Sequence, residues 1–123
     1  MSTAQALKLV QYVVIRRDLL DIMKWPVGAV IAQACHACTA VIHLNYGDDH
    51  TQEYLKDLDN MHKVVLEAKD EETIAKISQV LVDNDIKHKL WTEQPENYPT
   101  CLALKPYPKD DVHKYLKKLK LFK

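Results

Sequence analysis

Apolar positions along this chain recur at two spacings, one typical of buried strands and one typical of helices. Apolar runs rich in Val, Ile and Leu predict four strands, at residues 9–15, 63–68, 88–92 and 100–105. The first run has Gln11 as its one interior polar residue, which favours a central strand covered on both faces. The last two strands are joined by a proline-punctuated loop over residues 93–99.

Residues spaced three and four apart predict four helices, over residues 26–44, 51–58 and 70–84 and beginning after Pro108. Pro26 suits a first helical turn, and Asp70 is a good N-cap. Because strands alternate with amphipathic helices, we predict an α/β fold, a three-layer α/β/α domain with a four-stranded mixed sheet. A chain of 123 residues suffices for one core, so residues 1–123 are expected to form a single domain.

The helix that begins at Pro26 carries two polar side chains, Gln33 and His36, among apolar neighbours. Positions three residues apart share one helix face, so these side chains are expected to project together. The rest of the circumference is apolar, which predicts a helix largely enclosed in protein. An amide and an imidazole on such a helix must find polar partners or line a cleft.

Glycine and cysteine usage exclude several kinds of site. Gly28 and Gly47 are the only glycines, so a Gly-rich phosphate loop is excluded and no nucleotide cofactor is expected. The three cysteines favour reduced, buried thiols. Cys35 and Cys38 form a C-x-x-C pattern, but they lie inside a helix and lack further ligands at zinc spacing. Packing is therefore expected, with no metal site.

The N-terminus and the charge distribution bear on location and partners. Residues 1–5 lack a basic stretch followed by an apolar run, and no apolar run approaches the ~20 residues that span a bilayer. A cytoplasmic protein without a membrane partner is therefore expected. The formal net charge is zero, but positive charge gathers at the C-terminal lysines and at Arg16, Arg17 and Lys24.

Two loops are candidates for a site, since ligands of open α/β sheets gather where strands end and helices begin. Residues 16–25 lead into a helix N-terminus that favours an anion or an oxyanion, and residues 93–99 supply Glu93 and Asn97. If the first and third strands run in the same direction, these loops form one cleft. Such a cleft could position water for attack on an ester, with Glu93 or His36 as general base and Gln33 as orienting group.

Each of these three residues also has a purely structural interpretation. His36 could be an interior histidine bonded to a loop carbonyl, and Gln33 could cap loop backbone. Glu93 could be an ordinary solvated loop acid.

Four groups of residues share their order and spacing with a known family: residues 14–19, residue 28 with 31–37, residues 63–66 with 70–72, and residues 100–106. This pattern resembles the class 2 peptidyl-tRNA hydrolase family over nearly the whole chain. Residues 25–26, 32–37, 90–91, 93–97 and 106–108 and the ending at 115–118 resemble more closely its divergent subgroup, the peptidyl-tRNA hydrolase domain-containing proteins.

The resemblance implies a compact α/β/α domain that hydrolyses the ester between a peptide and tRNA without a metal or organic cofactor. It places Asp18, Gln33, His36 and Thr100 at positions that match the family. The expected partner is a tRNA acceptor end that carries a peptidyl or N-acyl-aminoacyl group, gripped through its phosphates.

The chain departs from the family pattern in two places. The Lys-Gly-Lys at the family's helix start reads Val-Gly-Ala at residues 27–29, which leaves Lys24 as the candidate to replace a lost cation. The family's Asp-Ala-Gly-Arg-Thr-Gln loop is replaced by residues 93–97, in which Glu93 stands in for the aspartate.

These considerations give two sets of candidate residues. The catalytic set is Gln33, His36, Glu93 and Lys24, and the substrate-binding set is Arg16, Asp18, Asn97 and Thr100. A homodimer is compatible with the sequence. Because both family lysines are absent, the alternative function is a catalytically degenerate tRNA- or protein-binding module of the same fold.

Overall fold

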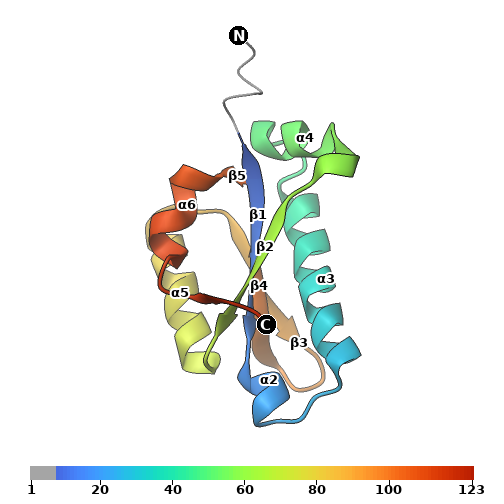
Figure 1. The fold of residues 1–123 in the computed structure, drawn as a ribbon, viewed down its shortest axis with the longest axis vertical. Helices are drawn as coiled ribbons and strands as arrows, with labels where there is room; N and C mark the ends of the chain where they lie inside the picture. The colour runs from blue at the N-terminus through green and yellow to red at the C-terminus, as the bar shows by residue number, and fades with distance from the viewer. Residues whose placement is uncertain (1–7) are drawn as a thin grey trace.

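A mixed β-sheet forms the middle layer of the computed structural model, which describes residues 8–123 (Figure 1). Its strands are β1 (Leu9–Arg16), β2 (Lys63–Ala68), β3 (His88–Glu93), β4 (Tyr98–Leu104), β5 (Tyr107–Pro108) and β6 (Lys120–Leu121). The strand order is β3-β4-β1-β2-β6, and β5 pairs with β1. Because β4 is antiparallel to both β1 and β3, β1 and β3 run in the same direction.

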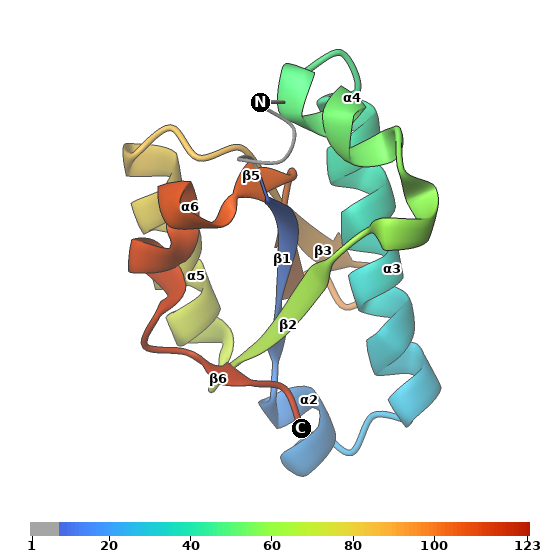
Figure 2. The same cartoon turned by 45° about the horizontal axis from the view of Figure 1, so that its top comes forward.

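Helices cover both faces of this sheet, as Figure 2 shows. One face carries α3 (Val27–Leu44) and α4 (Asp49–Leu55), and the other carries α5 (Glu71–Asp83) and α6 (Lys109–Leu116). Successive β1 residues point to opposite faces, so Val13 joins the core with Val30 of α3 while Val14 joins the core with Ile74 of α5. The predicted α/β/α layering and the central position of β1 are confirmed.

Short polar side chains begin two of the helices. The Asp70 carboxylate accepts a hydrogen bond from the Thr73 N–H at 2.9 Å, which confirms the predicted cap of α5. Asp48 does the same for α4 by accepting from the Thr51 N–H at 3.1 Å. Pro26 precedes α3 as its N-cap residue, one position before the first turn.

Several short elements differ from the prediction. Residues 16–25, predicted as a loop, contain the short helix α2 (Asp18–Asp21). The helix predicted over residues 51–58 is α4, followed by the 3-10 turn η1 (Leu58–Asn60). β5 and β6 extend the predicted four-stranded sheet to six strands. Each of these two strands has two residues, too few to produce a periodic signal in the sequence.

The helix α3 is buried on one face only, which corrects the prediction that protein encloses it. Its buried residues are Val30, Gln33, Ala37 and Val41. On the outward face, Val27 and Ile31 remain 62% and 58% exposed. Periodicity could not reveal this, because apolar residues occupy both faces of the helix.

The same helix corrects a second expectation, that no segment could span a membrane. By length and composition alone, the 18 residues of α3 are long and apolar enough to cross one. Core helices of folded domains meet the same criterion, and α3 packs on β1, β3 and β4. The expectation about residues 1–5 lies outside the described residues.

Candidate functional site

The two predicted loops meet at one edge of the sheet, because β1 and β3 run in the same direction and end there. An open pocket of about 290 Å³ lies at this edge beside the first turns of α3. We call it the α3 pocket, and its lining residues are Trp25, Pro26, Ala29, Gln33, Glu93 and Glu96. The predicted cleft between the two loops is therefore present.

Gln33 points from α3 toward the sheet and is 2% exposed. Its side-chain Oε1 accepts a hydrogen bond from the Thr100 hydroxyl of β4 at 2.9 Å, and its Nε2 donates to the Ala29 carbonyl at 3.2 Å. The Cys101 thiol donates to the Gln33 backbone carbonyl at 3.1 Å. Gln33 therefore does not cap loop backbone; Thr100 and Ala29 fix its amide at the wall of the α3 pocket.

Glu93 is the last residue of β3 and is half-buried. One of its carboxylate oxygens accepts a hydrogen bond from the Trp91 indole N–H at 3.1 Å. This contact orients the carboxylate and distinguishes Glu93 from an ordinary solvated loop acid. Glu96, in the turn that follows, is exposed and lines the same pocket.

His36 lies outside the α3 pocket, although it is one turn from Gln33 on the same helix. Its side chain is exposed, so the interpretation as an interior histidine is wrong. The imidazole stacks on the Trp91 ring with centroids 4.9 Å apart and planes inclined by 28°. Trp91 therefore connects His36 to Glu93, since it contacts both.

Arg16 and Asp18 form a buried ion pair beneath the site. The Arg16 side chain donates two hydrogen bonds to the Asp18 carboxylate, at 3.0 and 2.8 Å. A third, at 2.9 Å, reaches the Pro99 carbonyl, and the guanidinium lies 5.2 Å from the centre of the Tyr98 ring. Burial disfavours the charged form of Arg16, but the hydrogen bond and charge of Asp18 outweigh it and raise the Arg16 pKa. The pair fixes the start of β4 against the end of β1.

Two residues of the predicted site have left-handed backbone conformations. Lys24 has a φ of 58°, is exposed and does not line the α3 pocket. Asn97 has a φ of 59° in the turn between β3 and β4, where its N–H donates to the Glu93 carbonyl at 2.7 Å. Asparagine tolerates this conformation better than most residues, which explains its place in the turn.

The three cysteines differ in their surroundings. Cys35 is exposed, which corrects the prediction that it is buried, whereas Cys101 is fully buried. Burial raises the pKa of Cys101 to about 12 and also raises the pKa of Cys38, so both thiols stay protonated at neutral pH. Within residues 8–123, no group of three His, Cys, Asp or Glu side chains has the geometry to hold a metal ion.

Of the eight predicted site residues, the pocket itself brings together two, Gln33 and Glu93. Thr100 donates a hydrogen bond to the Gln33 side chain. The hydrogen bonds of Arg16, Asp18 and Asn97 fix the loops around the pocket. The prediction did not include Trp25, which lines the pocket with its ring 6.2 Å from that of Tyr98. Its position directly before Pro26, the N-cap residue of α3, was the available signal.

Chemically, the α3 pocket combines two carboxylates, a fixed amide and an aromatic ring. Arginine and lysine are absent from its described lining. A carboxylate can take a proton from water, and an amide N–H can stabilise a developing oxyanion. This combination suits hydrolysis of an ester or amide with water as the nucleophile.

Comparisons with known proteins agree with this chemistry. The sequence profile described as "Peptidyl-tRNA hydrolase PTH2" matches residues 9–122. A protein of Mus musculus named "Putative peptidyl-tRNA hydrolase PTRHD1" is 54% identical over 116 residues, covering 94% of this chain and 83% of its own length. A protein of Homo sapiens with the same name is 52% identical over 123 residues, covering 99% of this chain and 88% of its own length.

Proposed function

This chain belongs to the PTH2 family of peptidyl-tRNA hydrolases, and from that premise we propose that the α3 pocket is where it cleaves the ester between tRNA and a peptidyl or N-acyl-aminoacyl group. Family membership implies peptidyl-tRNA as the substrate class. The observation that supports this pocket is that Gln33 of α3 and Glu93 of β3, far apart in the sequence, line the same cavity.

In the proposed reaction, the Glu93 carboxylate takes a proton from a water molecule while the water oxygen bonds to the ester carbonyl carbon. The resulting tetrahedral intermediate breaks its bond to the ribose oxygen, which leaves with the proton that Glu93 took from the water, so the carboxylate is regenerated. The hydrogen bond from the Trp91 indole supports this role, because it orients the carboxylate without neutralising its charge.

Gln33 is proposed to stabilise the oxyanion of that intermediate. A side-chain amide nitrogen carries two hydrogens, and the Gln33 Nε2 uses one of them on the Ala29 carbonyl. The second is left for the substrate. Because Thr100 holds Oε1, the amide is oriented before the substrate arrives, and a preoriented donor contributes more to catalysis than one that must reorganise.

The acceptor end of the tRNA is proposed to cross the start of α3. Trp25 offers an aromatic face on which a terminal base can stack, and the exposed Lys24 beside it is placed to meet a phosphate. Arg16 and Asp18 form an ion pair with each other, so we assign them a positioning role in place of direct substrate binding.

The test is the release of N-acyl amino acid from N-acyl-aminoacyl-tRNA by the purified protein. Glu93→Gln keeps an oxygen that accepts from Trp91 but removes the base, and it should lower kcat by about 100-fold or more. Glu96→Gln is the matched control, since it removes the other carboxylate of the same pocket and should retain most of the activity. Equal activity of wild type and Glu93→Gln would overturn the assignment of Glu93 as base.

One observation favours the alternative of a binding module without catalysis: none of the described residues that line the α3 pocket is a lysine or arginine. Binding of tRNA that weakens steeply with salt, together with no turnover above a heat-denatured sample, would support that alternative. Turnover that Glu93→Gln abolishes would exclude it.

The homodimer and the cytoplasmic location remain predictions. The exposed apolar side chains on the outward face of α3, Val27 and Ile31, give a second copy a surface to cover. Sedimentation equilibrium of wild type and Ile31→Glu would test the dimer, which should dissociate in the variant.

A further inference from the structure

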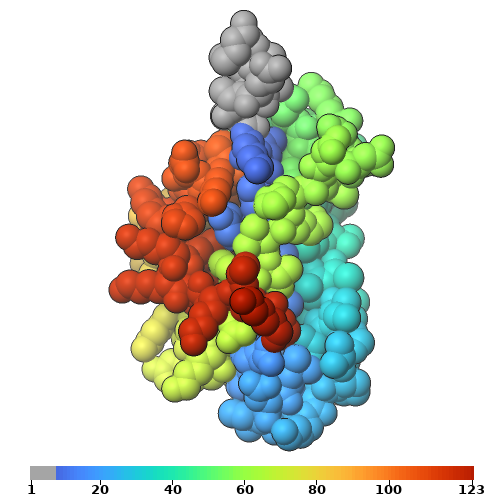
Figure 3. Space-filling view, in the orientation of Figure 1, coloured from blue at the N-terminus to red at the C-terminus, as the bar shows by residue number. Residues whose placement is uncertain are grey.

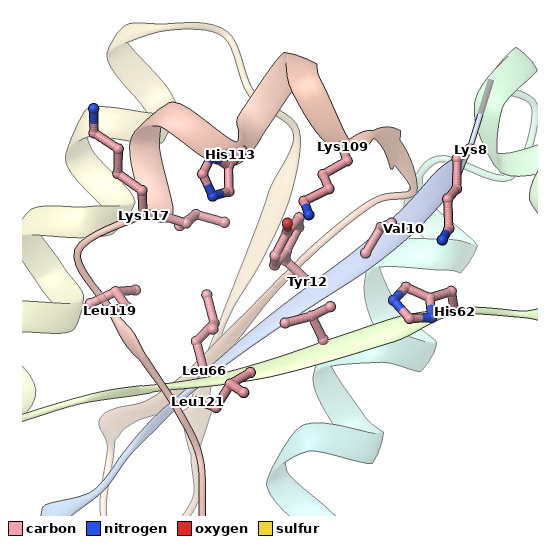
Figure 4. Close-up of a pocket in the computed structure, with 12 residues that line it drawn as sticks. Lys8, Val10, Tyr12, His62, Leu66, Lys109, His113, Lys117, Leu119 and Leu121 are labelled. Carbon is pink, nitrogen blue, oxygen red and sulfur yellow. The ribbon is translucent and has the colours of Figure 1, made fainter. Parts of the chain in front are cut away.

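A second pocket of about 320 Å³ lies on the opposite face of the sheet, between α6 and strands β1, β2 and β6 (Figure 4). We call it the α6 pocket. In the space-filling view, atoms of β1 are visible where the surface is hollowed between α6 and β2 (Figure 3). None of the residues that line it lines the α3 pocket, so the proposed hydrolysis does not use it.

The α6 pocket has an apolar floor and a basic rim. The floor is formed by Val10, Val64, Leu66, Leu116, Leu119 and Leu121. The rim is formed by Lys8, His62, Lys109, His113 and Lys117. No aspartate or glutamate is among the described residues that line this pocket, so its electrostatic preference is for an anion.

The basic side chains of the rim are not engaged elsewhere. Within residues 8–123, none of the five forms an ion pair or a side-chain hydrogen bond. Figure 4 shows the Lys109 ammonium directed toward the Tyr12 hydroxyl, while Lys117 extends away from it. Lys8 and His62 lie together at one end of the pocket, and Lys109 lies nearer the middle, beside Tyr12. The basic side chains are therefore distributed along the rim, and Lys109 is the one beside the Tyr12 hydroxyl.

Tyr12 supplies a hydrogen-bond donor to the α6 pocket. It lines the α6 pocket, is 4% exposed and makes no hydrogen bond through its hydroxyl to any residue in the described part of the chain. The hydroxyl oxygen is open to the pocket, since Thr51 Oγ1 is the one fully buried side-chain nitrogen or oxygen without a partner among the described residues. Burial raises the Tyr12 pKa, so the hydroxyl stays protonated at neutral pH and can donate to an anion.

From these observations we propose that the α6 pocket binds a medium-chain fatty acid, with the alkyl chain on the apolar floor and the carboxylate between Lys109 and the Tyr12 hydroxyl. The volume lies at the lower end of the range of small-molecule sites, roughly 300–1,000 Å³. The Val and Leu floor favours an alkyl chain over a nucleic acid, whose charge repeats along its whole length.

The test is a calorimetric titration of the full chain with sodium decanoate below its critical micelle concentration. We expect saturable binding of one decanoate per chain, with amide chemical-shift changes confined to β1, β2 and α6. Octanoate should bind about fourfold more weakly for each methylene that it lacks, and octan-1-ol should bind more weakly than octanoate.

Three variants test where the carboxylate of the ligand binds. Tyr12→Phe removes only the hydroxyl and should weaken decanoate binding by about tenfold, the effect of losing a hydrogen bond to a charged group. Lys109→Gln should weaken it by about threefold. Lys114→Gln, a lysine of the same helix outside this pocket, is the matched control and should leave the affinity unchanged.

Several results would overturn the proposal. Absence of saturable binding, equal affinity for octan-1-ol and octanoate, or unchanged affinity in Tyr12→Phe would each do so. Binding to phosphatidylserine vesicles without binding of decanoate would assign the basic rim to a membrane surface instead. Weaker tRNA binding by Lys109→Gln, again without decanoate binding, would assign the rim to RNA.

Discussion

The two faces of the sheet both have an apolar core but differ in where their buried polar groups lie. On the α3 face, buried polar groups link helix to sheet through the Gln33–Thr100 hydrogen bond, and the Arg16–Asp18 pair lies at the same edge. On the α5 and α6 face, the contact is mainly an apolar core that includes Ile74, Leu81 and Leu116, and the hydrogen bond between Ser78 of α5 and the His88 ring of β3, at 2.7 Å, is a polar link. Buried polar groups cost desolvation and demand fixed geometry, whereas apolar contacts tolerate small shifts. On the α3 face, the buried polar groups gather at the edge that carries the proposed chemistry, so the side chains there have fixed positions.

Loss of Arg16 should produce the largest effect on stability. In Arg16→Met the Asp18 carboxylate, only 12% exposed, loses its partner, and unfolding free energy in urea should fall by about 3–5 kcal/mol. Combining Arg16→Met with Asp18→Asn should recover part of that loss, because the unpaired charge is gone. A loss below about 1 kcal/mol, as for an exposed ion pair, would show that the pair is not part of what fixes this face.

An apolar truncation on the other face should cost nearly as much without touching the chemistry. Leu81 of α5 is fully buried, and Leu81→Ala should reduce the unfolding free energy by about 2–5 kcal/mol. Hydrolysis by the folded protein, measured well below its midpoint temperature, should remain at the wild-type rate. A reduced kcat there would mean that the two faces are coupled.

Thr100→Val should affect both stability and chemistry, by a smaller amount. It leaves the Gln33 Oε1 without its donor, which should cost about 1–3 kcal/mol of unfolding free energy. Because the Gln33 amide is then free to rotate, kcat should fall while decanoate binding on the other face stays unchanged. Thr100→Ser keeps the hydroxyl and should retain more activity; if Val and Ser variants are equally active, the hydrogen bond does not position Gln33.

His36 should give the smallest effect, since it is exposed and outside the α3 pocket. His36→Ala removes the stacking contact with Trp91 and should cost about 0.5–1 kcal/mol of stability. His36→Phe keeps an aromatic ring without ring nitrogens and should leave hydrolysis within a few-fold of wild type. A 100-fold loss in His36→Phe would make the imidazole, in place of Glu93, the group that activates water.

The sequence predicted those parts of the fold that depend on residues close to one another along the chain. The apolar run of β1 and the Asp70 cap of α5 are local signals, and both are present in the structure. The exposed face of α3 was not predictable, because Val27 and Ile31 carry the same apolar signal as the buried Val30. Which side meets the sheet depends on how α3 docks, and docking involves residues distant in sequence.

The sequence predicted the part of the candidate site that depends on local signals, and it did not predict the part that depends on contacts between distant residues. Strand ends and helix starts placed Gln33 and Glu93 correctly at one edge. Lys24 was expected to contribute a catalytic cation, but it has a left-handed backbone conformation and does not line the α3 pocket. That conformation, and the stacking of His36 on Trp91, arise from three-dimensional contacts that spacing along the chain does not encode.

Both tryptophans of the chain lie on the α3 face: Trp25 lines the α3 pocket, and Trp91 donates its indole N–H to Glu93. Their ultraviolet emission is therefore an intrinsic optical reporter of this face alone. An RNA base stacked on Trp25 would quench that emission, whereas a fatty acid bound in the α6 pocket would leave it nearly unchanged. A single fluorimeter cell can thus tell which of the two pockets a ligand has entered, without a label.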